Sequence, residues 1–474
     1  MTKLSFTERR KSDLEKLKIL AAKTPELFER RIFDEDADLL ESIGISIPGK
    51  KEMPKVLLKI FPSDFIVEEI TPDGRICTAT EKSDGFFDMD NANFVHATVV
   101  KCGMSTYDVV NELARILKCP IDKIQYAGIK DKWAITSQRI SIPLSIIEGN
   151  DIVLQNIEHP QFFLKDIVKG KGVVQPGFLQ GNRFTILLRN ENLTKEEKEE
   201  IKNNLELRAE KGMANFFYLQ RFRAPRYTNY HWATLVLKGD YKAAVKLFLT
   251  ETTGREMAYF ETLREAAGIV FDDPQKLHKI FGEYPSFFET EAQLTEYLAT
   301  HPKDFLGALK AIETQVQMWI YSLTSYYFNK KISSFLASNM LPPKTLPVVL
   351  STDKNDLLPY IEMLEEDEIF PQPTQNLRHF RSIQMKHREV KTFEKVNLDI
   401  VEATKEGIRL RFSLGKGQYA TTYLAHAVTL ANNIERNHEE EKAIVPSEYE
   451  EVLKRFTETN RARGTESLLA TDSE

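Results

Sequence analysis

A long helical block separates two parts of the chain that have the pattern of β-strands. From Phe216 to Leu350 apolar residues recur at helical spacing, as in DYKAAVKLFL. Before the block, VLLKIFPSDFIVEEI and NFVHATVVKCG are typical of strands, and VNLDIVEATKEGIRLRFSL follows it. Strands need partners, so the two β-rich portions are expected to complete one sheet around an inserted α-rich domain. The predicted fold class is therefore α+β.

The remaining boundaries follow from shifts in composition. Residues 1–44 have apolar positions at helical spacing and are expected to form an N-terminal helical extension. The sheet domain is predicted in two parts, 45–214 and 394–433, with the inserted domain at 215–393. Residues 434–474 are predicted to be an acidic, partly disordered C-terminal tail whose last ten residues have no fixed structure.

Composition and spacing exclude several classes of protein. The chain has 474 residues, 42% apolar and 28% charged, which excludes wholesale disorder and leaves room for two or three domains. No stretch approaches the roughly 18 uncharged apolar residues of a membrane span, and the start lacks the core of a secretory signal, so we expect a cytoplasmic protein. Three scattered cysteines do not form a disulfide framework, and the nine histidines lack metal-ligand spacing. We expect no cofactor and no metal.

Positive charge gathers in three segments, although the net charge is −6. The segments are 159–190, 201–231 and 375–395, each with about four net positive charges. In the second, aromatic residues interleave with the cations, a mixture suited to neutralising phosphates and stacking on exposed bases. A solvated helix face with core aromatics behind it explains the same pattern, and the residues alone favour that interpretation.

One turn contains a candidate catalytic group. AGIKDKWAITSQR places Asp131 between Lys130 and Lys132. Flanking cations favour the ionised carboxylate and Gly128 allows a sharp turn, so Asp131 could be presented at a sheet rim as a nucleophile or base. An Asp in a polar turn is more often a cap or a turn former, and the turn alone is a weak signal.

Four separated strings carry more information together than singly. They are KIFPSDFIVEEI (59–70), YAGIKDKWAITSQR (126–139), GNRFTILLRN (181–190) and LRFSLGKGQYATTYL (410–424). In order and spacing they resemble the TruD family of RNA pseudouridine synthases, and NFFYLQRF (215–222) resembles the start of that family's characteristic domain. The resemblance implies a pseudouridine-synthase-like mixed, largely antiparallel sheet with flanking helices and an inserted TruD-specific α-rich domain.

The resemblance also implies which residues act. Asp131 matches the family's catalytic aspartate, and Lys59 matches a lysine of its active site. The residues assigned to substrate binding are Phe65, Asn182, Phe184, Tyr419, Gln220 and Arg221. From their own sequence context, Phe65 and Phe184 would be strand core residues. Lys59 could equally be a strand-edge charge, and Asn182 a turn residue.

The implied activity is the isomerisation of a specific uridine in RNA. Transfer RNA, and its uridine 13, is the expected target, with RNA as the expected partner and a monomer favoured. The uridine must leave its stack, and the carboxylate either attacks C1′ or removes the C2′ proton; the sequence does not distinguish these routes.

Some features leave room for other functions. Trp133, Arg223 and the YLAH string at 423–426 depart from the family pattern and bear on the choice of substrate. The alternative function is a non-catalytic RNA-binding or RNA-folding module that uses the same basic cleft, with a protein-only scaffold third.

Overall fold

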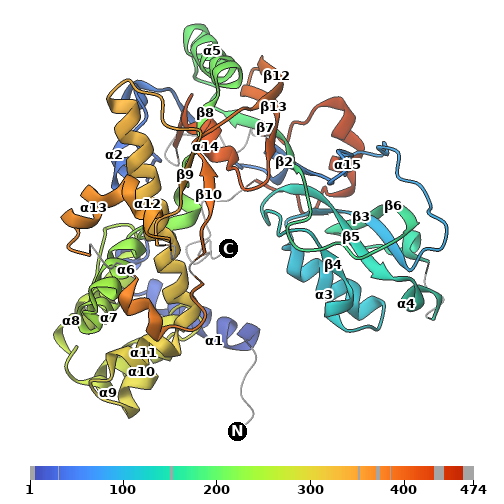
Figure 1. Ribbon diagram of the computed structural model, residues 1–474. Coiled ribbons are helices and arrows are strands. Elements are labelled where there is room, and N and C mark those ends of the chain that lie inside the picture. Colours follow the sequence, from blue (N-terminus) through green and yellow to red (C-terminus); the bar gives the residue numbers. More distant parts are fainter. Residues whose placement is uncertain are drawn as a thin grey trace. The chain divides into compact units, whose positions relative to one another are not determined.

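The structure is a computed structural model that describes residues 6–29, 31, 33–149, 153–350, 353–369, 374–384, 386–431 and 442–462. They form two compact units, which are visible in Figure 1. The helical unit comprises the described residues of Met1–Gly49 and Ala214–Phe393, and the sheet unit those of Lys50–Met213 and Glu394–Gly464. The boundaries between the five predicted segments stay a prediction, and the predicted disorder of the last ten residues lies outside the described residues.

The sheet unit is built on one ten-stranded sheet. Its strands are β1 (Lys55–Leu57), β2 (Phe65–Ile70), β3 (Phe94–Cys102), β4 (Gln125–Tyr126), β5 (Ile135–Pro143), β6 (Phe162–Gly170), β7 (Gly181–Arg189), β12 (Asn397–Ala403), β13 (Gly407–Gly415) and β14 (Thr429–Ala431). The main order is β12-β13-β7-β2-β5-β3-β6. Only β2–β5 and β1–β14 pair in parallel among the described strands, which confirms a mixed, largely antiparallel sheet.

The two β-rich portions of the chain pair with each other within this sheet. β13 follows the helical block, β7 precedes it, and they pair from Gly407 opposite Arg189 to Gly415 opposite Gly181. The α+β class with a helical insertion is thereby confirmed.

Helices cover both faces of the sheet. They are α3 (Thr106–Ile116), α4 (Leu144–Glu148), α5 (Lys195–Lys211), α14 (Ala420–Ala425) and α15 (Glu450–Arg455). Side chains alternate along β3, so Val95 and Val99 pack in one core with α3, while Val100 packs in another with Val452 of α15. Part of the segment predicted as a tail therefore belongs to the sheet core, because its apolar side chains have a face to bury.

The helical unit contains the other α-helices and a small antiparallel sheet of two strands that lie far apart in the sequence. They are α1 (Phe6–Ala21), α2 (Ala37–Ser42), α6 (Asn229–Lys238), α7 (Tyr241–Thr250), α8 (Ala258–Ile269), α9 (Pro274–Gly282), α10 (Glu289–Thr300), α11 (Phe305–Ala311), α12 (Glu313–Ala337), α13 (Ile361–Glu366), β9 (Thr345–Pro347) and β10 (Glu389–Lys391). Along the described residues the chain passes from one unit to the other after Gly49, within β8 (Met213–Ala214) and within β11 (Phe393–Glu394). No helix among the described residues is long and apolar enough to cross a membrane.

The core of the helical unit lies along α12, which runs beside α6 in Figure 1. Trp232 of α6 meets Trp319 of α12 with ring centroids 5.1 Å apart. The N-terminal segment is part of this unit: the Asp13 carboxylate accepts hydrogen bonds from the Ser286 amide (2.9 Å) and hydroxyl (2.6 Å). The helices predicted as an extension thus bury their apolar face against the inserted block.

Candidate active site

The turn between β4 and β5 carries Asp131, and neighbouring side chains hold its backbone. The amine of Lys101, at the end of β3, donates a hydrogen bond to the carbonyl oxygen of Asp131 (2.6 Å). The amide of Lys130 donates to Oγ1 of Thr106 (3.0 Å), the first residue of α3. These bonds satisfy main-chain groups that a loop otherwise leaves unpaired. Asp131 is therefore presented from a fixed turn.

Lys59 reaches the same place from the end of β1. Its φ of 57° lies in the left-handed region. This conformation costs a non-glycine residue about 1–3 kcal/mol, and contacts with the surrounding structure must offset that cost. Trp133 Nε1 donates to the carbonyl oxygen of Lys59 (3.1 Å). A few residues on, the buried Asp64 accepts two hydrogen bonds from Arg189 (2.8 and 2.7 Å). The departure from the family pattern at Trp133 thus has a structural role, because its indole holds the Lys59 backbone.

Lys59 and Asp131 form an ion pair although they are 72 residues apart. Lys59 Nζ lies 2.5 Å from Asp131 Oδ1 and 4.2 Å from the centre of the Phe65 ring. Burial raises the pKa of Asp131. The charge and hydrogen bond of Lys59 and the charge of Lys101 together lower this pKa by more than burial raises it, so it lies below its ordinary value. Since 32% of the Asp131 side chain is exposed, the site presents an anion at neutral pH to which a substrate has access.

Lys130, next to Asp131 in the chain, points to other partners. Its Nζ lies 2.9 Å from Glu69 Oε2 and donates to Asn182 Oδ1 (2.8 Å). From the sequence, the flanking lysines and Lys59 are both expected to favour the ionised form of Asp131. The cations with the largest effect on Asp131 are Lys59, as expected, and Lys101, which comes from β3.

The two phenylalanines assigned to substrate binding lie in the hydrophobic core. Phe65 and Phe184 are 3% and 6% exposed, and their rings meet edge to face at 5.9 Å. Phe184 also stacks on Phe412 of β13 at 5.3 Å. These contacts agree with the interpretation from sequence context. Their part in holding a uridine stays a prediction.

The other assigned residues of the sheet unit are Asn182 and Tyr419. Asn182 sits on β7 opposite Glu69 and reaches the Asp131 turn only through Lys130. Tyr419 is half-buried at the residue that precedes α14. The structure thus joins Asp131, Lys59 and Phe65 directly and adds Asn182 one contact away, while the role of Tyr419 stays a prediction.

Gln220 and Arg221 belong to the helical unit, on the short helix η6 (Leu219–Phe222). Gln220 is exposed, and the Arg221 guanidinium lies 5.3 Å from the centre of the Phe217 ring. Arg226 in the same basic segment is 5% exposed and donates to the Phe248 carbonyl (2.8 Å). The segment is therefore no uniform basic face: Arg226 is an interior residue.

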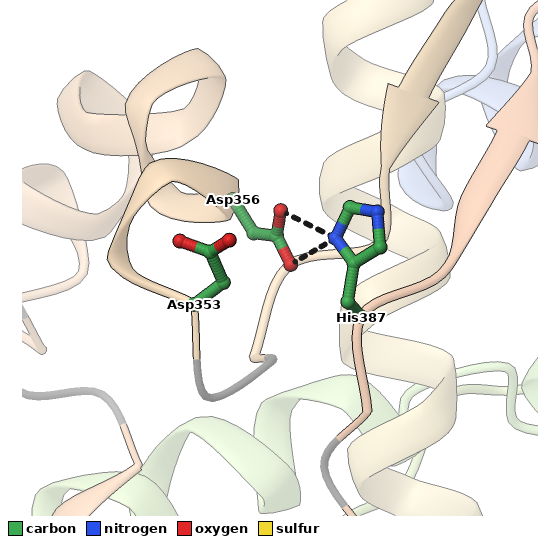
Figure 2. A group of neighbouring side chains, drawn as sticks. All are labelled: Asp353, Asp356 and His387. Carbon is green, nitrogen blue, oxygen red and sulfur yellow. Dashed lines mark hydrogen bonds and ion pairs between the residues drawn. The ribbon is translucent and has the colours of Figure 1, made fainter.

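One cluster among the described residues has the composition of a metal site, and it lies in the helical unit (Figure 2). His387 Nδ1 lies 2.9 and 3.0 Å from the two carboxylate oxygens of Asp356, while Asp353 accepts from the Asn355 amide (2.9 Å). The hydrogen bond and charge of Asp356 raise the pKa of His387. A His–Asp ion pair accounts for this geometry without a metal. Spacing along the chain could not indicate it, since His387 and Asp356 are 31 residues apart.

The fold is shared with a solved structure. The crystal structure titled as that of the putative tRNA pseudouridine synthase D (TruD) from Methanosarcina mazei has a TM-score of 0.65 to this chain at 21% identity, covering 83% of this chain and 98% of that one. This likeness shows the architecture alone.

The family follows from the sequence. The sequence model of TruD, tRNA pseudouridine synthase D, matches residues 52–349. A protein of Methanococcus maripaludis named probable tRNA pseudouridine synthase D is 29% identical over 58% of this chain and 67% of its own length. One from Methanocaldococcus jannaschii, named probable tRNA pseudouridine synthase D 1, is also 29% identical, over 58% of this chain and 68% of its own length. The chain belongs to the TruD family, which confirms the enzyme class that its motifs predicted.

Sequence reasoning missed Lys101. The alternation in NFVHATVVKCG indicates its position: alternate residues of a strand point to the same face, and Lys101 alternates with Val95, Ala97 and Val99, which all face the core. A lysine at an inward position of a strand needs a partner for its charge, and here the partner is the candidate catalytic turn.

Proposed function

We propose that this protein converts a uridine of transfer RNA to pseudouridine, with uridine 13 as the target and Asp131 as the reacting carboxylate. The observation that carries the proposal is the partly exposed Asp131 anion, which pairs with Lys59 and stands in the GIKDK turn that resembles the family's catalytic motif. The names of the relatives support transfer RNA as the substrate class.

The proposed reaction is an isomerisation, so the product has the atoms and electrons of the substrate. The bond between N1 of uracil and C1′ of ribose breaks, the base turns, and a bond forms between C5 and C1′. C5 loses a proton and N1 gains one. Asp131 starts the sequence either by attacking C1′ or by removing the C2′ proton, and both routes need the carboxylate ionised. Lys59 supplies that condition by its charge at Oδ1.

The uridine has to leave its stack to reach Asp131, which costs a few kcal/mol. Contacts with the base offset this cost, and a stacked aromatic ring contributes about 1–3 kcal/mol per base. We assign this contact to Tyr419, which is half-buried rather than sealed in the core. We assign Phe65 and Phe184 a supporting role: their rings meet in the core of the sheet, the Phe65 ring lies 4.2 Å from the Lys59 amine, and Phe184 follows Asn182 by two residues on β7.

The test compares pseudouridine in RNA from cells with and without this gene, and then the purified protein with its Asp131→Asn variant. The asparagine keeps the shape of the side chain and removes its charge. We expect one uridine of transfer RNA to lose its modification in the deletion strain, and the variant to bind RNA without forming product. If the uridine that loses its modification in the deletion strain is not uridine 13, the proposed target is wrong and the proposed reaction still holds. Normal turnover by the variant would contradict the assignment of Asp131.

A non-catalytic RNA-binding module remains the rival in this test. It predicts that deletion of the gene leaves the pseudouridine map unchanged, while salt-dependent RNA binding persists in vitro. The cytoplasmic location and the monomeric state stay predictions.

A further inference from the structure

Lys101 is a buried cation that the proposed reaction does not yet use. It is fully buried (0% exposed) at the inward face of β3. Burying an ammonium group is costly unless its charge and hydrogen bonds are compensated. Its amine donates to the carbonyl oxygen of Asp131 at 2.6 Å and, over a longer distance of 3.4 Å, to that of Lys130. Lys101 is therefore attached to the backbone of the turn that presents the carboxylate.

Lys59 and Lys101, which both contact Asp131, differ in their exposure to solvent. Lys59 is 23% exposed and contacts the carboxylate itself, so an RNA phosphate or a ribose hydroxyl can compete for it. Lys101 contacts the peptide behind the carboxylate and lies out of reach of a substrate. Its position and charge should consequently be the same in the free enzyme and in the complex with RNA.

We propose that Lys101 is a positioning residue for Asp131: it fixes the turn by its hydrogen bond to the Asp131 carbonyl and supplies a positive charge that stays in place when RNA binds. This inference rests on the proposed function, since it concerns the same carboxylate. Among the charged groups near Asp131, Lys59 from the segment after β1 and Lys101 from β3 have the largest effects on its ionisation. Both favour the anion, so loss of Lys101 should make the anion harder to form.

The chain provides a matched control. Lys50 is a second buried lysine of the sheet unit, 3% exposed, whose amine also donates to main-chain carbonyls, those of Ala425 (3.1 Å) and Val428 (2.5 Å). Loss of Lys50 removes a comparable buried cation and a comparable pair of hydrogen bonds at the end of α14. A purely structural role of Lys101 predicts that the two lysine variants behave alike.

The experiment measures the single-turnover rate of pseudouridine formation against pH for wild type, Lys101→Met, Lys101→Gln and Lys50→Met, with folding checked by circular dichroism. Wild type should keep its rate down to about pH 5, because the ordinary pKa of Asp is about 3.9 and that of Asp131 is lower. Lys101→Met should lose about tenfold to a hundredfold in rate at neutral pH and lose more as the pH falls toward 5, with RNA affinity unchanged. Lys101→Gln keeps a hydrogen-bond donor without the charge, and should recover part of the neutral rate but keep the acid sensitivity.

Lys50→Met should have the pH profile of wild type for its folded fraction. If Lys101→Met does not fold, Lys101→Gln decides alone, by its acid sensitivity. A wild-type rate and pH profile in the folded Lys101 variants would overturn the inference while leaving the role of Asp131 intact. Normal turnover by Asp131→Asn would instead contradict the proposed function itself, so the two failures are distinguishable.

Discussion

The Lys59–Asp131 pair of the sheet unit and a charged cluster of the helical unit are made of the same kinds of group, but only the first is open to solvent. The cluster consists of Arg226, Glu256, Arg264 and Glu291. Arg264 Nη2 lies 3.1 Å from Glu291 and 2.9 Å from Glu256, and Arg226 lies 3.7 Å from Glu291. The Arg264 and Glu256 side chains are 3% and 8% exposed, against 23% and 32% for Lys59 and Asp131.

The difference in exposure separates a structural role from a chemical one. In the cluster two cations and two anions pair with one another in the interior, and each of the four side chains is less than 10% exposed. At Asp131, Lys59 contacts one carboxylate oxygen and Lys101 contacts the backbone carbonyl, which leaves part of the carboxylate accessible. An ion pair is thus informative about function only when its burial is known as well.

The largest expected effect is that of Asp131→Asn. The rate of pseudouridine formation should fall by about three orders of magnitude or more, because the reaction needs the anion at its first step. The free energy of unfolding should change by less than about 1 kcal/mol, since a partly exposed ion pair contributes little. Chemical denaturation and single-turnover kinetics on one preparation measure both. Glu112→Gln, which removes a surface carboxylate paired with Arg115, is the control and should change neither.

Arg264→Met should show the opposite pattern. Removing one partner of a buried charge network leaves carboxylates uncompensated and costs about 3–5 kcal/mol of stability. The rate constant of the fraction that stays folded should remain close to wild type. Denaturant unfolding monitored by circular dichroism gives the first quantity. A variant as stable as wild type would mean that the cluster tolerates the loss, and the comparison would fail on its structural side.

The basic segment of the helical unit should divide by exposure. Arg223 is exposed and Arg221 half-buried, and replacing both by Gln should weaken binding of all RNAs about tenfold and flatten the salt dependence. Arg226→Gln should reduce stability and leave the salt dependence unchanged, because Arg226 is an interior residue. Fluorescence titrations at several salt concentrations measure the slopes. A reduced slope for Arg226→Gln would show that it contacts phosphate after all.

Acid should weaken the helical unit more than the active site. Burial raises the pKa of Glu256, but Arg264 and Arg226 together lower it by more than burial raises it. The pKa of Glu256 therefore lies below its ordinary value, and so does the pKa of Asp131. A carboxyl with a depressed folded-state pKa contributes stability above its unfolded-state pKa and loses that contribution as the pH falls through the folded-state pKa. The free energy of unfolding should therefore be flat above about pH 5.5 and fall below about pH 4. Glu256→Gln should reduce this acid loss more than Asp131→Asn.

The smallest effect is expected for Tyr419→Phe. If the ring stacks on the target base, the rate should change by less than about threefold, whereas Tyr419→Ala should lose roughly tenfold to a hundredfold. Single-turnover rates of the two variants decide between ring and hydroxyl. Equal losses in both would assign the hydroxyl a part in proton transfer or positioning.

Much of the candidate site could be predicted because its residues lie in short motifs. Asp131 and Lys59 each stand in a string that resembles the family, and the structure joins them in one ion pair. The partners of the other charges could not be predicted in this way. The sequence predicts that Lys130 compensates the charge of Asp131, but its amine pairs with Glu69. The sequence also groups Arg226 with the RNA-binding cations, but its side chain lies in the core.

The class of the fold and the candidate reacting residue follow from the sequence. The alternation of apolar residues specifies strands, the 3.6-residue period specifies the inserted helices, and both are local properties of the chain. Tertiary structure alone decided which charges meet. Lys101 comes to the Asp131 turn because β3 ends beside it, and His387 comes to Asp356 across 31 residues. The energy of an ion pair depends on the distance between its atoms and on how much water they lose, and both are set only when the chain has packed.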